Sequence, residues 1–319
     1  MLKIKKYQPK YINEWNKFIL NSNNGTLFHN QEFITYHINR KFIDCSLMIY
    51  YYNKLIALFP AAMKNDVTVF SHPGASHGGL VIKTNLDFSI LNDIIKEIDS
   101  FYKRKKNKFI FIINTPKIYY KNLHDSLDYL LQWNGYNQEE LYISHVVSLL
   151  DAPVHQLLSK RKQRYIKNKN HQYKFIESAD FNDFYVLLEK NKKIYNALPT
   201  HSLEELKKLN TLFPNQVKLF LSKNNNTTIG GSLLFFINPR VCLVFYNVVS
   251  NQHRNSQLST FQFYSAMKIA KKQGCEIVDF GVSHSPEKKN PFEPKFSLIK
   301  FKEQFGAFGV LRTGYKKEL

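Results

Sequence analysis

The chain has 319 residues and a mass of 37.6 kDa, with 45 Lys and Arg residues against 25 Asp and Glu, and its formal net charge is +20. This length suits about two domains, and a composition that is 44% hydrophobic and 15% aromatic can bury a large core, which excludes wholesale disorder. The basic excess favours anionic partners, although Lys outnumbers Arg 38 to 7, a bias typical of AT-rich coding sequences.

The first half of the chain predicts a strand, two helices, an antiparallel meander, a third helix and a buried strand. Apolar residues with helical spacing surround Trp15 and fill 88–102, whereas 109–113 is a short apolar run typical of a buried strand. The turn Asn53-Lys54 is expected to join the first two strands of the meander. The expected elements are, in order, a strand at 2–6, helices near Trp15 and at 31–39, strands at 45–52, 55–63 and 67–72, a helix at 88–102 and a strand at 109–113.

The second half repeats this order. Ser202 followed by Glu205 has the spacing of a capping box, which begins a helix, and Gly274 is expected to end the last helix. The expected elements are a strand at 173–176, helices at 181–192 and 203–212, strands at 217–221, 229–237 and 241–249, a helix at 259–272 and a strand at 276–280. The repeat predicts two similar domains.

The charge differs between the two halves. Residues 154–170, between the repeats, form a basic segment that we expect to be a helix or an arm. The net charge is +6 for residues 1–150 and +14 for residues 151–319. Groups that bind anionic ligands are therefore expected mainly in the second half.

Three segments carry a resemblance to a known family. Residues 71–80 (SHPGASHGGL) are similar to a small-residue loop after the first meander, and 161–167 (RKQRYIK) to a basic segment that opens the second domain. Residues 279–281 (DFG) and 301–307 (FKEQFGA) resemble a C-terminal DFG and FKxxFG signature. With the repeated order of elements, these segments resemble the tandem Fem-type (FemAB-like) branch of the GNAT acyltransferases. The resemblance implies an α/β fold with mixed (α+β) sheets and two tandem GNAT-like domains with a cleft between them.

The resemblance also implies an N-acyltransferase, with acceptor contacts in the first domain, 1–150, and the acyl-donor site in the second, 151–319. The loop form His-Pro-Gly-Ala-Ser-His-Gly-Gly favours members that resemble CoA-dependent enzymes acting on nucleotide-linked (dTDP- or UDP-) amino sugars, for surface polysaccharide such as lipopolysaccharide O-antigen. Acyl-CoA would then be a co-substrate, no cofactor would be tightly bound, and the amine would attack directly without an acyl-enzyme. A homodimer is left open.

Two alternatives also stay open. The first is a Fem-type transferase that takes an amino acid from aminoacyl-tRNA and acts on a peptidoglycan precursor. The second is a non-enzymatic nucleic-acid-binding protein, although the sequence contains no helix-turn-helix, zinc-finger, RNP or KH motif.

Acyl transfer needs a carrier held at its phosphates and a hydrogen-bond donor to the developing oxyanion. By the resemblance, the carrier's pyrophosphate lies at the N-terminus of the helix after the second meander, here 252–260. The glycines usual there are absent, because none lies between Ser250 and Gly274, so side chains are expected to bind the phosphates. The expected carrier-binding residues are Asn247 and Val248, beside a β-bulge, and Arg254, Ser256, Ser259 and Thr260.

Histidines, one carboxylate and several basic residues are candidates for catalysis and acceptor binding. The candidate catalytic residues are His72, Asp279 and Tyr246, although Tyr246 also suits a core position and Asp279 a turn. Lys300 and Lys302 would share one face if their segment were a strand. The candidate substrate-binding residues are His72, His77, Ser76, His284, Arg161, Arg164, Lys300 and Lys302.

Cys45, Cys242 and Cys275 lie in or beside apolar runs without a CxxC or Cys/His spacing, so we expect reduced core cysteines and no metal site. Apolar runs such as 241–246 are far shorter than the about 20 residues that span a bilayer. No apolar stretch typical of a signal peptide follows the basic N-terminus. We therefore expect a soluble cytoplasmic protein.

Overall fold

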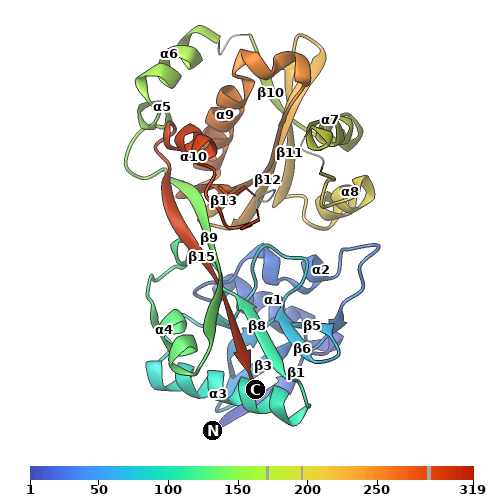
Figure 1. The fold of residues 1–319 in the computed structure, drawn as a ribbon, viewed down its shortest axis with the longest axis vertical. Coiled ribbons are helices and arrows are strands. Elements are labelled where there is room, and N and C mark those ends of the chain that lie inside the picture. Colours follow the sequence, from blue (N-terminus) through green and yellow to red (C-terminus); the bar gives the residue numbers. More distant parts are fainter. Residues whose placement is uncertain (170–171, 195–196, 286–288) are drawn as a thin grey trace. The chain divides into compact units, whose positions relative to one another are not determined.

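The computed structural model describes residues 1–169, 172–194, 197–285 and 289–319, which form two compact units (Figure 1). Unit 1 comprises Met1–Ile143 and Val310–Leu319, and unit 2 comprises Ser144–Gly309. The C-terminal residues 310–319 thus fold with the first half of the chain, which the repeat of elements does not predict. Two long strands, β9 (Asn137–Ser148) and β15 (Phe308–Glu318), contribute residues to both units.

Unit 1 contains two sheets and the helices around them. Four strands pair in the order β1-β3-β4-β7, while in the other sheet β5 pairs with β6, β6 runs parallel to β8, and β8 pairs with β15. Apolar side chains of α3 and β8 meet in its main core, including Ile94, Ile98 and Ile110. The elements are β1 (Leu2–Lys6), η1 (Pro9–Tyr11), α1 (Ile12–Asn21), η2 (Leu27–His29), α2 (Gln31–Ile34), β2 (Ile43–Asp44), β3 (Leu47–Tyr51), β4 (Lys54–Phe59), β5 (Ala62–Asn65), β6 (Thr68–Ser71), β7 (Val81–Ile82), α3 (Phe88–Arg104), β8 (Phe109–Ile113), η3 (Lys117–Tyr119) and α4 (Ser126–Trp133).

The first meander differs from its prediction in two places. The expected strand at 55–63 is broken by Pro60 into β4 and β5, which belong to different sheets, because proline cannot donate to a strand ladder. The turn before β4 lies one residue earlier than expected, at Tyr52 and Asn53, which have φ angles of 44° and 61°. The helix expected at 31–39 was also too long, since α2 forms a single turn and ends at Ile34.

Unit 2 is built on a sheet in which β10, β11, β12 and β13 are antiparallel neighbours, β14 runs parallel to β13, and β9 pairs with β14. Helix α9 packs on one face of β12 and β13, and α7 packs on the other face (Figure 1). The elements are α5 (Val154–Leu157), α6 (Lys160–Lys169), β10 (Lys174–Ser178), α7 (Phe181–Lys193), α8 (Leu203–Leu212), β11 (Val217–Asn224), β12 (Thr227–Asn238), β13 (Val241–Val249), η4 (Asn251–Ser256), α9 (Leu258–Lys272), β14 (Ile277–Val282) and α10 (Phe296–Glu303).

Local signals in unit 2 act as predicted. The capping box is confirmed, because the backbone N–H of Glu205 donates to Ser202 Oγ at 3.2 Å and the backbone N–H of Ser202 donates to Glu205 Oε2 at 3.0 Å. Gly274 follows the end of α9 with a φ of 81°, as expected of a residue that stops a helix.

Two other segments of unit 2 refine or correct their predictions. The basic segment forms α5 and α6, and its expected last residue, Asn170, lies outside the described residues. The segment with Lys300 and Lys302 is the helix α10 and not a strand, so residues two apart are separated by about 160° around the helix axis. Lys300 is exposed and Lys302 is buried. No helix within the described ranges is long and apolar enough to span a bilayer.

Candidate functional site

One edge of β13 in unit 2 loses its partner part-way along the strand. Val241–Leu243 pairs in parallel with Ile277–Asp279, and no further pair joins β13 to β14 among the residues that the structure describes. The backbone groups of β13 that face β14 are therefore without a strand partner from Val244 onward. Such an edge can bind the amide groups of an extended ligand.

A β-bulge lies at the same place. Tyr246 is opposite Leu233 on β12 and Val244 is opposite Leu234, which leaves Phe245 as the extra residue. This confirms the bulge that the resemblance implies, directly before Tyr246. A bulge bends its strand and redirects backbone groups, and bulges are frequent next to active sites.

Alternate residues after the bulge face opposite sides of the sheet. The hydroxyl of Tyr246 lies 2.5 Å from Thr200 Oγ1 and 3.0 Å from His201 Nδ1, and burial raises its pKa. Asn247 Nδ2 donates instead to Ser259 Oγ at 3.4 Å, toward the start of α9. Tyr246 thus has the core position that was its structural alternative, while Asn247 and Ser259 connect the strand to the helix.

The helix start expected to hold the carrier's phosphates has no glycine turn. Gln257 adopts the left-handed conformation there, with a φ of 55°, and the backbone N–H of Thr260 donates to its carbonyl at 2.8 Å. Ser256 Oγ donates to the carbonyl of His253 at 2.6 Å within η4, and Arg254 is exposed. Val248, the other expected carrier contact, has a buried side chain.

A lysine that the sequence analysis did not select lies beneath this helix start. Lys162 Nζ, on α6, donates to Thr260 Oγ1 at 2.7 Å and to Gln257 Oε1 at 3.2 Å. Its ammonium also lies 5.0 Å and 5.8 Å from the ring centres of Phe301 and Phe305. Lys162 is only 5% exposed, and burial lowers its pKa. The side chain of Thr260 is fully buried, so its hydroxyl binds Lys162 and does not face solvent.

The DFG segment is held by its own backbone. Asp279, which is 2% exposed, accepts from the backbone N–H of Gly281 at 2.5 Å and from Ser144 Oγ at 2.7 Å. Gly281 has a φ of 75°, a conformation that favours glycine. Asp279 therefore closes onto the backbone that follows it, at an irregular turn within β14, as in its structural alternative.

Lys302 binds the same turn from α10. Its Nζ donates to the carbonyls of Gly281 and Val282 at 2.6 Å and 3.0 Å and to Ser283 Oγ at 2.9 Å. Burial lowers the pKa of Lys302 to about 8, and the nearby carboxylate of Asp279 partly opposes that shift. Because three acceptors already match the three N–H groups, contact with a ligand phosphate would require an exchange of one of these bonds.

The remaining candidates lie in different surroundings. Arg161, Arg164 and Lys300 are exposed, and Ser76 is half-buried. His284 is buried and pairs with Pro294 in an isolated bridge.

In unit 1, His77 of the small-residue loop and His29 of η2 are both buried. His77 Nε2 lies 3.1 Å from Thr26 Oγ1, and His29 Nε2 lies 2.9 Å from the carbonyl of Gly78. The backbone N–H of Thr26 donates to His29 Nδ1 at 2.9 Å, so His29 is the tautomer that donates from Nε2. Burial lowers the pKa of His29 to about 4 and that of His77 well below its usual value. Burial therefore favours the neutral form of both rings, and their hydrogen bonds connect the loop to 26–29.

His72, at the start of the loop, lines a pocket of about 380 Å³ together with Gln31, Arg40, Lys41 and Phe42. His72 and Gln31 are 3% and 6% exposed, and neither His72 Nδ1 nor Gln31 Nε2 has a hydrogen-bond partner among the described residues. Burial lowers the pKa of His72 to about 3. Buried polar atoms of this kind are costly unless a ligand or water binds them, so this pocket is a candidate ligand site.

The cysteines are unsuited to covalent catalysis. Burial raises the pKa of Cys45 to about 12, that of Cys275 to about 11, and that of Cys242 well above its usual value. A thiol with a raised pKa is a poor nucleophile at neutral pH. In the described part of the chain, no three His, Cys, Asp or Glu side chains are grouped so that they could hold a metal ion.

Comparisons with solved structures identify the fold. The structure resembles that of FemX with a TM-score of 0.75 and 12% sequence identity, over 99% of this chain and 97% of that one. A tandem GNAT protein from the clavulanic acid biosynthesis pathway aligns with a TM-score of 0.57 and 9% identity, over 100% and 98% of the two chains. L-PGS from Bacillus licheniformis aligns with a TM-score of 0.60 and 11% identity, over 97% and 91%. The chain has the tandem GNAT fold. No protein-family model and no curated protein matches the sequence.

The tandem GNAT fold confirms the predicted fold class, but one residue was missed near the helix start in unit 2 and one in the His72 pocket of unit 1. Lys162 lies four positions before Ile166, and both are buried on one face of α6, so helical spacing was an available signal for its burial. Gln31 has no comparable signal, because His72, which lines the same pocket, is 41 residues away in the sequence.

Proposed function

We propose that this chain is an N-acyltransferase that moves an acyl group from acyl-CoA to the amine of a nucleotide-linked (dTDP- or UDP-) amino sugar. The observation that carries the proposal is the free edge of β13, where the pairing with β14 ends at Leu243 and the bulge at Phe245 follows. The pantetheine arm of CoA contains two amides that can pair with such an edge as an added strand does.

Charge near the start of α9 supports a phosphorylated carrier. Lys162 contributes a buried ammonium beneath the helix start, and the exposed Arg254 lies in η4 just before it. The helix dipole adds partial positive charge at the same end. These positive charges would attract the phosphates in place of the backbone N–H groups that a glycine turn at Gln257 would supply.

The reaction needs no nucleophile from the protein. The amine lone pair attacks the thioester carbonyl, a C–N bond forms, and the C–S bond breaks as the CoA thiolate leaves with its electron pair. The proton released by the amine passes to water or to the thiolate. The raised pKa values of the cysteines favour this direct transfer over an acyl-enzyme.

Unit 1 offers acceptor contacts. The pocket beside His72 is lined by Arg40 and Lys41, whose charges suit the phosphates of a nucleotide-linked sugar. The neutral ring of His72 and the amide of Gln31 would bind uncharged polar groups of the same ligand. His77 shapes this site indirectly by holding the loop.

The test is the release of free thiol when the protein is mixed with acyl-CoAs and a panel of dTDP- and UDP-linked amino sugars. We expect thiol release that requires both substrates, with a product that carries an amide. The N-acetylated form of each sugar is the matched control, because it has no free amine. The proposal is wrong if no acyl-CoA supports turnover with any amino sugar.

A second candidate is transfer from aminoacyl-tRNA to a peptidoglycan precursor. The higher TM-score to FemX, 0.75 against 0.57 for the tandem GNAT protein, favours it, and so does the absence of the usual glycines near Gln257. Charged tRNA with a muropeptide acceptor tests it directly. Binding of tRNA with a steep dependence on salt would indicate many phosphate contacts, whereas a CoA-sized ligand gives a shallow dependence.

A further inference from the structure

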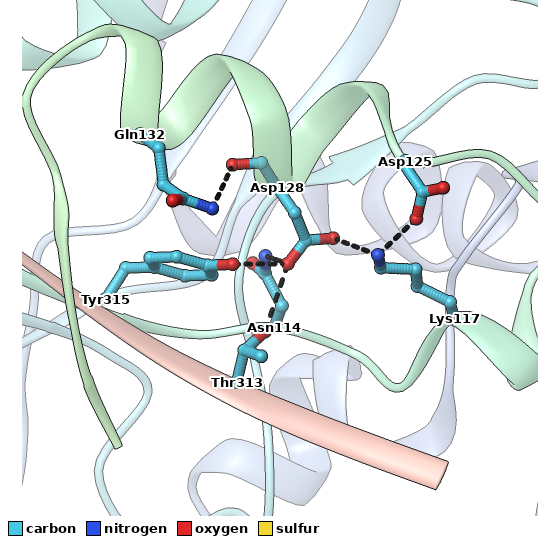
Figure 2. Close-up of polar contacts among 7 residues, drawn as sticks. All are labelled: Asn114, Lys117, Asp125, Asp128, Gln132, Thr313 and Tyr315. Carbon is cyan, nitrogen blue, oxygen red and sulfur yellow. Dashed lines mark hydrogen bonds and ion pairs between the residues drawn. The ribbon is translucent and has the colours of Figure 1, made fainter. Parts of the chain in front are cut away.

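A second pocket in unit 1, of about 430 Å³, has a buried carboxylate in its lining. The carboxylate belongs to Asp128 on α4, a residue that is 7% exposed (Figure 2). Lys117, Gln132, Thr313 and Tyr315 line the same pocket. A buried carboxylate is costly unless its oxygens are bound, so the contacts of its two oxygens show what the pocket can accept.

The two carboxylate oxygens of Asp128 differ in the number of donors that contact them. Oδ1 accepts from Tyr315 at 2.9 Å, from Thr313 at 3.0 Å and from Asn114 at 3.3 Å, and these neutral donors fix the plane of the carboxylate (Figure 2). Oδ2 has a single close contact among the described residues, Lys117 Nζ at 3.5 Å. A carboxylate oxygen accepts about two hydrogen bonds, so Oδ2 retains capacity for a ligand.

Lys117 does not neutralise this oxygen by itself. Its Nζ makes a shorter contact with Asp125, whose side chain is 79% exposed, so one ammonium is shared between two carboxylates (Figure 2). Partial burial opposes the charge of Lys117, but the two carboxylates outweigh burial and raise its pKa. These three side chains together carry one net negative charge, in a chain whose formal net charge is +20.

We propose that this pocket binds the acceptor's primary amine in its ammonium form, with Asp128 Oδ2 as the principal contact. Lys117 keeps Asp125 as its partner when the ammonium approaches. The amide oxygens of Gln132 and Gln138, which also line the pocket, are further acceptors for a group with three N–H donors. This inference deepens the proposed function and rests on it, because it concerns how the acceptor's amine is recognised; the bound ammonium must release a proton to water before its lone pair can attack the thioester.

The contacts of Asp128 also hold β15 against α4, so the test must separate binding from folding. Asp128→Asn keeps an oxygen at the Oδ1 position and removes the charge. Asp99 on α3 supplies a matched control, since it accepts from Tyr136 at 2.6 Å and from Lys317 on β15 at 2.6 Å, and it does not line this pocket. Asp99→Asn should therefore weaken a similar attachment of β15 and leave the pocket intact.

The experiment measures binding in the absence of any acyl carrier. The probes are methyl glucosaminide, its N-acetylated counterpart and Nα-acetyl-lysine amide, each titrated into the full chain and followed by NMR, below the pKa of the probe amines. We expect an ammonium probe to bind with shifts at Leu311 and Thr313, and the N-acetylated sugar not to bind. Asp128→Asn should weaken binding about 10- to 100-fold and Asp99→Asn should not.

The two ammonium probes identify the source of the amine. Preference for methyl glucosaminide indicates an amino sugar, and preference for the lysine amide indicates an amino-acid side chain. The inference is overturned if neither ammonium probe binds, if the N-acetylated sugar binds equally well, or if Asp128→Asn binds like the unchanged protein. An equal loss in Asp99→Asn would assign the effect to folding and overturn it as well.

Failure of the proposed function is a separate result. Binding that depends on Asp128, without transfer from any acyl-CoA, would leave the ammonium site standing and remove the CoA-dependent activity. Transfer from acyl-CoA with an unchanged KM for the amine in Asp128→Asn would support the activity and remove the site.

Discussion

The ammonium of Lys162 donates a 2.7 Å hydrogen bond to the hydroxyl of Thr260 in the first turn of α9. No carboxylate pairs with Lys162 among the described residues, and the helix end above it also carries partial positive charge. A buried cation in this position costs stability. An anion bound at the helix start would offset that cost, which is why we connect Lys162 with the phosphates of an acyl carrier.

Lys162→Met tests this connection. Methionine has a similar length and packs well beside Phe301 and Phe305, so we expect stability to be unchanged or increased. The KM for acyl-CoA should rise about 10- to 100-fold, the range for loss of a charged hydrogen bond. The control is Lys160→Met, an exposed lysine on the same helix. Equal KM values for the two variants would contradict the role of Lys162.

Gln31→Leu should separate stability from acceptor binding. Gln31 Nε2 is buried without a partner among the described residues, so its removal should raise the free energy of unfolding by about 1 kcal/mol. The KM for the acceptor should rise about tenfold if that N–H binds the ligand. Gln262→Leu is the contrasting variant, because Gln262 Nε2 donates to Ser222 and to Val248. We expect it to lower stability, as measured by urea unfolding. A loss of stability in Gln31→Leu would show that the amide has a structural role instead.

Buried histidines should make the protein sensitive to acid. The folded-state pKa values of His29 and His72, about 4 and about 3, lie below the unfolded value of 6.5 because burial disfavours the charged ring. The unfolded chain therefore binds more protons as the pH falls below 6.5, and stability is lost in that direction. At pH 5 each histidine should cost about 2 kcal/mol relative to pH 7.5.

Urea unfolding at pH 7.5 and pH 5 checks this expectation. His72→Phe should reduce the loss between the two pH values by about 2 kcal/mol, since phenylalanine does not titrate. The control, His155→Gln, changes an exposed histidine and should behave like the unchanged protein. An unaltered pH dependence in His72→Phe would contradict the lowered pKa.

Lys302 should act in the same direction as the histidines, but in an alkaline pH range. Its folded-state pKa of about 8 is below the unfolded value of 10.5, mainly because of burial, so between these values the unfolded chain binds more protons and stability rises with pH. Lys302→Met leaves the carbonyls of Gly281 and Val282 without their donor and should be less stable at every pH. The stability gap between the unchanged protein and Lys302→Met should widen by about 2 kcal/mol from pH 7 to pH 9.5. Urea unfolding of both proteins measures the gap, and a constant gap would contradict the lowered pKa.

Much of the local structure could be predicted because its signals act over a few residues. Ser202 and Glu205 form their capping box, Gly274 follows the end of α9, and the helix expected at 88–102 is observed at Phe88–Arg104. The prediction of a single strand at 55–63 failed because a local signal was misinterpreted. Pro60 was placed inside a strand, although it lacks the N–H that a strand ladder needs.

Contacts between polar groups that are far apart in the sequence could not be predicted in the same way. Asp279 was selected as a candidate catalytic residue and Lys302 as a substrate contact, but both bind the turn at Gly281. Asp128 was not selected because it lies outside the segments that carry the resemblance, and within 161–167 Arg161 and Arg164 were selected instead of Lys162. Burial decides these roles, and burial depends on packing between distant elements.

By itself, the sequence predicted many of the helices and strands in each half, although not α4, β9 or β15, because periodicity and caps depend on contacts within one or two turns. The tandem GNAT fold was expected from the resemblance to a known family. Only the tertiary structure decided the candidate sites. Thr260 is 98 residues from Lys162, and Thr313 is 185 residues from Asp128. Hydrogen bonds over such separations form only after strands have paired and helices have packed, and no local pattern specifies them.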